Sequence, residues 1–383
     1  MTEQSTERAA RPRLFSGEPV LDYFSRVAQI MPSVAMPAAS QPIDWPSGTP
    51  IDLPPSYSYL GVDRSTEDLL AETDTAALLV LHEGAIRFER YWHTGGPDVQ
   101  WLSMSVAKSF VSALVGIAVD DGLIGGLDDP ISSYIRVDAG SAYDGVSIRD
   151  VLQMSSGARW NEDYSDSSSD VFALTAAFGR GSLDAFVAGA ASKAEPGTVC
   201  RYNSTDTQAL GTLLVAATGR SLADYMTEQL IEPLGMTAPS HWLVDAEGRE
   251  AAFFGLTMTA RDFARLGELY RQAGRCNGRQ IVPEHYVADS VRSHLRHTEP
   301  GQVWAGDHQF DLGYGYHWWL PDGDPGEFSA IGVYNQFVYV HPSSGVVIVK
   351  LSANQAYGTS TADEVNRELE NLAMLRAIAR SVS

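Results

Sequence analysis

The order in which strand and helix patterns follow one another constrains the fold of this chain more than any other feature. Residues 76–81 and 86–92 read as two strands around a turn at Glu83-Gly84, which predicts a β-hairpin near the N-terminus. The late stretch "GVYNQFVYVHPSSGVVIVKLS" predicts a second hairpin with its turn at Pro342–Gly345. From Ser105 onward the apolar period becomes helical. We therefore predict an α+β fold whose antiparallel sheet uses strands from both ends of the chain, with helices inserted between them.

The first 65 residues are expected to wrap the surface as extended chain. They contain nine prolines, and proline lacks a backbone donor and restricts the residue before it. One short helix is expected within "VLDYFSRVAQIM". Residues 1–135 and 236–383 are assigned to an α/β lobe. Residues 136–235, which alternate helical runs with Gly, Ser and Pro breaks, are assigned to a mainly helical lobe.

Two more helices are predicted toward the C-terminus. "TARDFARLGELYRQAG" is amphipathic, and "STADEVNRELENLAMLRAIAR" carries an apolar stripe that can face a core. Thr361 and Glu364 have the spacing of a capping box, which predicts that the last helix begins there.

Charge and composition narrow the range of partners and locations. A net charge of −21 disfavours nucleic acid and anionic membranes as partners. The two cysteines, Cys200 and Cys276, do not make a disulfide framework. The first residues lack an apolar signal segment, and no stretch approaches 18 apolar residues in a row. We therefore expect a cytoplasmic, non-membrane protein.

Ser105 and Lys108, in "WLSMSVAKSF", form the first chemical motif. The chain has only three lysines, and one of them follows a serine by three positions, on the same side of a helix start. A serine hydroxyl is a poor nucleophile until a base takes its proton, and a lysine can act as that base when burial lowers its pKa. An N-cap serine followed by a surface lysine fits the pair alone equally well.

Two later features extend this motif. Tyr202 follows a Pro-Gly turn and precedes a helix, and a tyrosine beside a lysine can accept or donate a proton. On its own Tyr202 also reads as an ordinary core or rim tyrosine. The stretch "IGVYNQFVY" is expected to be an edge strand, which beside the nucleophile would aim a backbone N–H at a developing oxyanion.

These features, in this order, resemble the serine β-lactamase and penicillin-binding superfamily. The stretches "SIRDVLQMSSG", "EPGTVCRYNSTD", "IEPLGM" and "TMTARDFARLG" resemble its class C and family VIII esterase branch. Within that branch, "GEPVLDYF", "IMPSVAMP", "WNEDY" and "HWWL" are similar to the 6-aminohexanoate-dimer hydrolase group. The resemblance covers about residues 17–355. It implies a β-lactamase/transpeptidase-like fold with the active site at the seam of two lobes.

The resemblance also implies roles for individual residues. Ser105 would be the acylated nucleophile, Lys108 its base and Tyr202 the partner in proton transfer. The oxyanion would lie between the backbone N–H groups of Ser105 and Phe337. The further candidates for substrate binding are Tyr164, which would close over the substrate, Asn161, Tyr334 and Gln336. No cofactor or metal is required, and the relatives are compatible with a homodimer.

Two departures from the resemblance bear on the substrate. Tyr334-Asn335-Gln336 stands where β-lactamases have Lys-Thr-Gly, so the cation that binds a substrate carboxylate is missing. Thr175 stands in register with the acid that holds the substrate amine in 6-aminohexanoate hydrolases, and Asp166 and Asp170 are out of register. A carboxylesterase or amidase acting on a small, less charged molecule is therefore the leading prediction. A β-lactamase or D-Ala-D-Ala peptidase, and a non-catalytic binding protein of the same fold, are the alternatives.

Two other groups are weaker candidates. His294 and His297 have the spacing of a metal-binding pair, but their polar, unpartnered surroundings favour surface histidines. Trp318 and Trp319 could line an acyl pocket. Because neighbours on a strand face opposite sides, only one of the two can do so.

Overall fold

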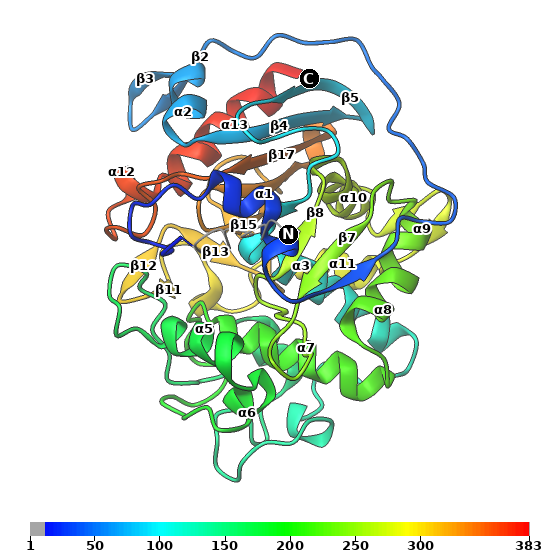
Figure 1. Cartoon of the computed structure of the whole chain (residues 1–383), viewed down its shortest axis with the longest axis vertical. Coiled ribbons are helices and arrows are strands. Elements are labelled where there is room, and N and C mark those ends of the chain that lie inside the picture. The colour runs from blue at the N-terminus through cyan, green and yellow to red at the C-terminus, as the bar shows by residue number, and fades with distance from the viewer. Residues whose placement is uncertain (1–11, 383) are drawn as a thin grey trace, which may run out of the picture.

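The main sheet joins strands from both ends of the chain, as predicted. The structure, a computed structural model, describes residues 12–382. Seven antiparallel strands lie in the order β13-β14-β15-β16-β17-β4-β5 (Figure 1). Their bounds are β13 Leu312–Tyr314, β14 Trp319–Pro321, β15 Phe328–Gly332, β16 Gln336–His341, β17 Val346–Ser352, β4 Thr75–His82 and β5 Ala85–Tyr91. Pairing of β17 with β4 brings the two predicted hairpins into one continuous sheet.

Both predicted hairpins form at the expected turns. Glu83 and Gly84 connect β4 to β5 with φ angles of 48° and 73°, the left-handed pair that a tight hairpin turn requires. A short 3-10 helix, Pro342–Ser344, connects β16 to β17.

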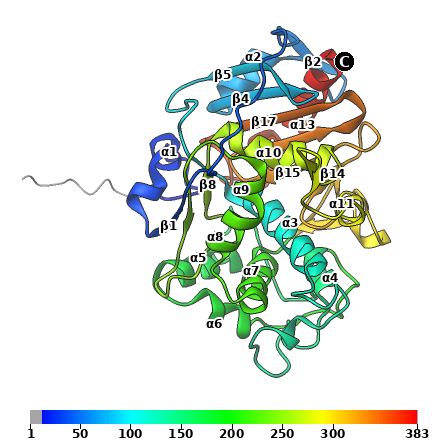
Figure 2. The same ribbon diagram turned by 90° about the vertical axis from the view of Figure 1, so that its right-hand side faces the viewer.

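Helices cover both faces of the main sheet, which explains its nearly continuous apolar strands. Val338 and Val347 point toward α10, with α3 in the same core behind it. Phe337 and Ile348, which neighbour them in sequence, point to the opposite face and pack with α13. Figure 2 shows α10 on the inner side of the sheet, between β17 and the helices below. The bounds of the three helices are α3 Ala107–Asp120, α10 Ala260–Arg271 and α13 Glu368–Val382.

A smaller sheet carries the chain toward the motif at Ser105. It has four strands in the order β1-β7-β8-β6, and the last residue of β6, Leu102, lies three positions before Ser105. The bounds are β1 Ser33–Met36, β6 Trp101–Leu102, β7 Ser240–Leu243 and β8 Leu256–Met258.

The N-terminal segment contains more regular structure than the extended wrap that we predicted. The expected short helix is present as α1. The segment also contributes β1 and a hairpin, β2–β3, whose short strands the many prolines conceal in the sequence. The bounds are α1 Leu21–Ile30, β2 Ser56–Tyr59, β3 Val62–Ser65 and, directly after them, α2 Thr66–Glu72.

Helices dominate the predicted helical region, which occupies the lower half of Figure 1. α7 packs against α3, α4 and α6. The bounds are α4 Ile148–Leu152, α5 Asp170–Arg180, α6 Leu183–Ala188, α7 Ser204–Thr218, α8 Leu222–Met226 and α9 Glu232–Leu234. The division of the chain into two lobes stays a prediction. Within residues 12–382, no helix is both long and apolar enough to cross a lipid bilayer.

In chain order, the remaining elements lie between α10 and β13. They are β9 Arg275–Cys276, β10 Arg279–Gln280, α11 Glu284–Ser290, β11 Val303–Ala305 and β12 His308–Phe310. The β11–β12 hairpin reaches back to the helical region through hydrogen bonds between Trp304 and the backbone of Cys200 and Tyr202.

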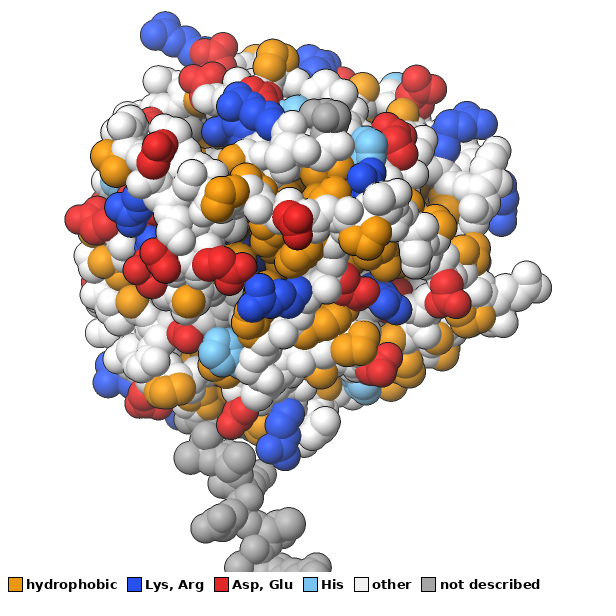
Figure 3. All heavy atoms as spheres, turned by 90° about the horizontal axis from the view of Figure 1, so that it is seen from above, with side chains coloured by type: hydrophobic (Ala, Val, Ile, Leu, Met, Phe, Trp, Pro, Cys, Tyr) orange, Lys and Arg blue, Asp and Glu red, His pale blue; other side chains and the backbone are white. Residues whose placement is uncertain are grey.

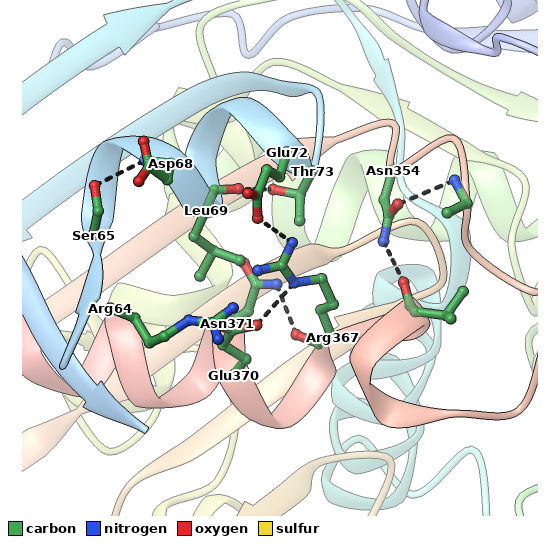
Figure 4. A network of polar contacts seen from close by, with 12 residues as sticks. Arg64, Ser65, Asp68, Leu69, Glu72, Thr73, Asn354, Arg367, Glu370 and Asn371 are labelled. Carbon is green, nitrogen blue, oxygen red and sulfur yellow. Dashed lines mark hydrogen bonds and ion pairs between the residues drawn. The ribbon is translucent and has the colours of Figure 1, made fainter. Parts of the chain in front are cut away.

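The predicted C-terminal helix is interrupted, and the capping box at Thr361 and Glu364 is wrong. α12 (Asp363–Asn366) follows Ala362, which makes no side-chain cap. Arg367 then has a φ of 62°, which separates α12 from α13. Its guanidinium lies between Glu72 and Glu370, as Figure 4 shows, and its carbonyl accepts a hydrogen bond from Asn371. These ion pairs stabilise a conformation that arginine rarely adopts.

Charged side chains of both signs are interspersed on the face seen in Figure 3, between patches of hydrophobic atoms. That face therefore presents no single basic stripe of the kind that binds a nucleic acid backbone.

Candidate active site

Ser105 lies at the entry to α3, in a short 3-10 turn formed by Met104–Val106. Met104, directly before it, has a φ of 46°, a strained conformation for a residue with a side chain. Ser105 is 7% exposed, and its Oγ accepts a hydrogen bond of 2.9 Å from Lys108 Nζ. The structure therefore brings the predicted pair together within one helical turn.

Lys108 is enclosed almost completely, with 1% of its surface exposed. Its three hydrogen-bond partners are Ser105 Oγ, Ser204 Oγ at 3.1 Å and the carbonyl of Phe253 at 3.0 Å. None of them carries a charge, so burial lowers the pKa of Lys108 from 10.5 to about 8, against an opposing contribution from the Glu162 carboxylate. A lysine with this pKa is partly neutral near pH 7, as a general base requires.

Tyr202 lies on the other side of the same two side chains. The Lys108 ammonium is 5.0 Å from the centre of its ring, and the tyrosine interacts with the Ser105 side chain. Its ring packs on Trp319, with centroids 5.0 Å apart. Burial, and secondarily the Glu162 carboxylate, raise the pKa of Tyr202 well above its ordinary value. The hydroxyl is therefore protonated at rest and can donate a proton.

Glu162 is a central residue of the site that the sequence analysis missed. It is 4% exposed, and its carboxylate accepts hydrogen bonds from Ser204 Oγ at 2.6 Å and from Tyr164 Oη at 2.6 Å. Ser204 in turn accepts from Lys108, so a continuous chain joins Glu162 to the lysine. The signal available in the sequence was the acid of "WNEDY" itself, of which only the tyrosine and the asparagine were considered.

The backbone beside Ser105 belongs to Gly332 rather than to Phe337. A Cβ built on Gly332 would lie 3.0 Å from the Ser105 nitrogen and 2.8 Å from the Ser103 oxygen. Phe337 is paired with Ile331 on one side and Lys350 on the other. Its N–H is thus committed to an interior ladder of the sheet. The prediction that Phe337 donates a hydrogen bond to the oxyanion is therefore wrong. The predicted edge strand is in fact a hairpin of two interior strands, β15 and β16.

Tyr164 lines a cavity next to Tyr202. Its ring packs on Phe15 of the N-terminal segment, with centroids 4.4 Å apart. The other groups around the cavity come from the "NEDY" loop, the β11–β12 hairpin, the end of β15 and the segment before α13. The lining residues that carry polar or aromatic groups are Glu162, Asp163, Tyr164, Tyr202, His308, Phe310, Trp319, Tyr357, Ser360, Thr361, Asn366 and Glu368.

Gln336 has a structural role instead of the predicted contact with substrate. Its Nε2 donates to the carbonyls of Val333, Tyr334 and Ser352, and its Oε1 accepts from Trp101 Nε1 at 3.0 Å and from the Ser352 nitrogen. Because the side chain is buried and every hydrogen-bonding group has a partner, Gln336 is not available to a ligand.

The other two predicted binding residues also make contacts within the protein. Tyr334 is 1% exposed, and its hydroxyl accepts a hydrogen bond from the Phe15 nitrogen at 2.6 Å. Asn161 stabilises its own loop. Its Oδ1 accepts a hydrogen bond from the Asp163 backbone nitrogen at 3.0 Å, and its own backbone nitrogen donates to the Asp170 carboxylate. Neither lines the cavity.

Thr175 and the two acids near it, Asp166 and Asp170, do not line the cavity either. Thr175 Oγ1 donates to the carbonyl of Val171 at 2.8 Å. Asp166 bonds to Ser168, and Asp170 pairs with Arg159 at 3.1 Å. Among the two tryptophans, Trp319 lines the cavity, whereas Trp318 packs in the core on Tyr270.

The two histidines are half-buried side chains with separate partners. His294 Nε2 lies 2.7 Å from the Asp289 carbonyl, and His297 Nε2 lies 3.2 Å from Ser155 Oγ. Over the described residues, no group of three or more His, Cys, Asp or Glu side chains is arranged to bind a metal ion. Cys200 and Cys276 are both free thiols.

Comparison with known proteins identifies the family to which the chain belongs. The chain is 29% identical over 370 residues to the 6-aminohexanoate-dimer hydrolase of Paenarthrobacter ureafaciens, covering 90% of this chain and 91% of the relative. A Bacillus anthracis structure, provisionally described as a 6-aminohexanoate-dimer hydrolase, superposes with a TM-score of 0.82 at 22% identity, covering 97% of this chain and 99% of that one. A family VIII carboxylesterase superposes with a TM-score of 0.61 at 15% identity, over 82% and 96% of the two chains. The family model described as Beta-lactamase matches residues 62–373, and the chain therefore belongs to the Beta-lactamase family.

Proposed function

We propose that this protein is a serine hydrolase that cleaves small carboxylic esters or amides through a covalent acyl-enzyme. The observation that carries the proposal is the buried Lys108 Nζ, 2.9 Å from Ser105 Oγ, whose partners are two hydroxyls and a carbonyl. An amine in this environment loses its proton far more readily than one on the surface. The similarity to a hydrolase and to an esterase fold supports the same reaction class.

In the proposed acylation step, neutral Lys108 takes the hydroxyl proton of Ser105. The Oγ forms a bond to the substrate carbonyl carbon, and the π electrons of that carbonyl move onto its oxygen. When the intermediate collapses, the bond to the alcohol or amine breaks, and the Tyr202 hydroxyl donates a proton to the leaving atom. Lys108, now protonated, restores the proton of Tyr202. In deacylation, neutral Lys108 takes a proton from water, whose oxygen forms a bond to the acyl carbon. The bond to Ser105 Oγ then breaks, Tyr202 gives Oγ its proton and is reprotonated by Lys108, and the acid is released.

The oxyanion of each intermediate needs backbone donors in fixed positions. We assign the first to the Ser105 N–H, at the entry to α3. The second is the N–H of Val333, because Val333 lines the cavity and follows Gly332, whose backbone is next to the Ser105 nitrogen. Gly332 permits this approach because it has no Cβ.

The cavity favours uncharged or cationic substrates. Glu162, Asp163 and Glu368 are among its lining residues, which include neither lysine nor arginine. A β-lactam or a D-Ala-D-Ala peptide carries a carboxylate, which these acids would repel. The β-lactamase alternative is therefore ranked below an esterase or amidase, although the family match keeps it under test.

The remaining expectations belong to the same proposal. They are a cytoplasmic location, a homodimer, and activity without a cofactor, nucleic acid or membrane. Light scattering of the purified protein measures its mass in solution. Retention of activity after prolonged treatment with a chelator is the result expected for a metal-independent hydrolase.

A substrate panel tests the proposed function. It contains p-nitrophenyl esters of increasing acyl length, linear amides and a chromogenic cephalosporin, each measured with the wild type and with Ser105→Ala. We expect ester or amide hydrolysis that Ser105→Ala abolishes and that exceeds cephalosporin hydrolysis. Faster cephalosporin turnover would favour the β-lactamase, and hydrolysis of nothing in the panel would favour the non-catalytic alternative.

A further inference from the structure

Glu368, the first residue of α13, is a buried acid that the proposed reaction leaves unused. It is 6% exposed and lines the same cavity as Tyr202 and Glu162. Its Oε1 accepts a hydrogen bond from the Tyr357 hydroxyl. Its Oε2 is buried and has no hydrogen-bond partner among the described residues, and the only other group that acts on the carboxyl by hydrogen bonding is the residue's own backbone N–H. A buried carboxyl oxygen without a partner is costly, so its retention beside a ligand cavity calls for an explanation.

Among residues 12–382, no cation compensates this acid. Arg367 precedes it directly, but that guanidinium is occupied by Glu72 and Glu370. Burial is the main cause that raises the pKa of Glu368 from 4.5 to about 7, against the hydrogen bonds from the Tyr357 hydroxyl and the residue's own backbone N–H, which lower it. The fold thus places the Glu368 carboxyl at the cavity without a positively charged partner. A ligand can supply that partner instead.

The position of Glu368 relative to the reaction centre is fixed by Tyr357. The Tyr357 hydroxyl, which holds Glu368, is close enough to Tyr202 and Glu162 for both groups to affect its pKa. Glu368 and Tyr357 therefore belong to a wall of the cavity that the C-terminal segment builds, and the "NEDY" loop contributes other lining residues.

We propose that Glu368 determines specificity by accepting a hydrogen bond, through Oε2, from a donor group at the far end of the substrate. The donor is an ammonium, hydroxyl or amide N–H group, and a carboxylate at the same position is rejected. This inference rests on the proposed function and deepens it, because it names the kind of ester or amide that the site selects. Glu368 touches the substrate away from the reacting bond, so it acts on recognition.

A matched series of substrates tests the inference. It comprises the p-nitroanilides of hexanoic, 5-hydroxypentanoic, 5-aminopentanoic and adipic acids (the last as the monoanilide), which end in methyl, hydroxyl, ammonium and carboxylate groups, together with a shorter and a longer homologous set. The wild type is expected to give the highest kcat/KM on the hydroxyl or ammonium member of a set and the lowest on the carboxylate member. A wild type that prefers the methyl or the carboxylate member in every set would overturn the proposal.

Glu368→Gln assigns the preference to this residue, and Glu364→Gln is the matched control. Glu364 is an exposed acid on α12 that does not line the cavity. Glu368→Gln is expected to reduce the ratio of kcat/KM for the ammonium member to that for the methyl member by about tenfold to a hundredfold, as loss of a charged hydrogen bond does. Glu364→Gln should leave the ratio unchanged. An equal change in all four substrates would show a merely structural role.

Binding to an acylation-deficient protein separates this inference from the proposed function. Calorimetric titration of Ser105→Ala with pentylamine, pentanol and hexanoate needs no turnover. Tighter binding of pentylamine than of hexanoate, lost in the double variant with Glu368→Gln, supports the role of Glu368 even if no ester is hydrolysed. Equal binding of the three, or a preference that survives Glu368→Gln, overturns it. If Glu368→Gln does not fold, Glu368→Asp, whose shorter side chain withdraws the carboxylate, replaces it in both measurements, and an unchanged preference in that variant overturns the proposal.

Discussion

At the scale of single residues, the site depends on the pKa of one amine, that of Lys108, and on the groups that set it. Lys108 is buried, its partners are neutral, and the nearest acid, Glu162, reaches it through Ser204. Burial lowers the pKa of Lys108 to about 8 and Glu162 raises it. Under the proposed function, these two opposing effects set the pH at which Lys108 can activate Ser105.

The first prediction concerns the pH dependence of this activation. Lys108 must be neutral to act as a base, so kcat/KM for an uncharged ester should rise with pH up to about 8 and level off above it. Glu162→Gln removes the carboxylate that raises the lysine pKa, so the rising limb should move to lower pH. Asp163→Asn is the matched control, because Asp163 lines the cavity and its carboxylate bonds only to Ser165 in the described contacts. A limb that stays in place in Glu162→Gln would contradict the account.

The second prediction concerns Gln336. Gln336→Met keeps the volume of the side chain but leaves Trp101 Nε1, the Ser352 nitrogen and a buried carbonyl without partners. Each unsatisfied buried group costs about 1–3 kcal/mol, so the free energy of unfolding should fall by about 3 kcal/mol or more. Urea denaturation measures the change. Gln302→Met, at an exposed position, should change it by less than about 0.5 kcal/mol.

At the scale of elements, the close approach of α10 to the main sheet depends on Gly267. A Cβ at this position would lie 2.6 Å from Val347 Cγ1 and 2.9 Å from Val338 Cγ1, and both valines are fully buried. Valine side chains are stiff and cannot turn away, so the helix itself would have to move.

The third prediction follows from this contact. Gly267→Ala should lower the free energy of unfolding by about 1–3 kcal/mol through overpacking. Gly179→Ala is the control within a helix, since a Cβ on Gly179 of α5 meets no atom within 4 Å. There alanine should be neutral or stabilise by up to about 1 kcal/mol, because it restricts the unfolded chain. Thermal or urea unfolding of both variants tests the pair, and equal effects would contradict the close packing of α10.

The elements also show what the sequence could and could not reveal. Periodicity predicted β4–β5, β16–β17 and α3, because each is long and apolar on the expected face. It failed at "IGVYNQFVY", where the turn uses Tyr334 and Asn335 at φ angles of 65° and 66° without glycine or proline. The stretch therefore read as one strand, and the oxyanion donor was placed at Phe337. Arg367 concealed the break before α13 in the same way.

At the scale of the whole molecule, the cavity is assembled from segments far apart in the sequence. Glu162 comes from the helical region, Val333 from the main sheet and Glu368 from the last helix. Ser105, Lys108 and Tyr202 were predictable because a short motif and a family resemblance carry them. Glu162 and Glu368 were not, because only tertiary packing shows which acids of this strongly acidic chain lose their solvent.

The proposed function requires that the molecule as a whole acylates Ser105 with Lys108 as the base, and the mass of the intact protein during turnover measures that step directly. The wild type mixed with a p-nitrophenyl ester, or with a fluorophosphonate, should gain the mass of one acyl or phosphonyl group, and peptide mapping should place it on Ser105. Lys108→Ala should acquire the adduct at least about a hundredfold more slowly, whereas Lys193→Ala, which changes an exposed lysine, should match the wild type. An adduct on another residue, or labelling of Lys108→Ala at the wild-type rate, would contradict the account.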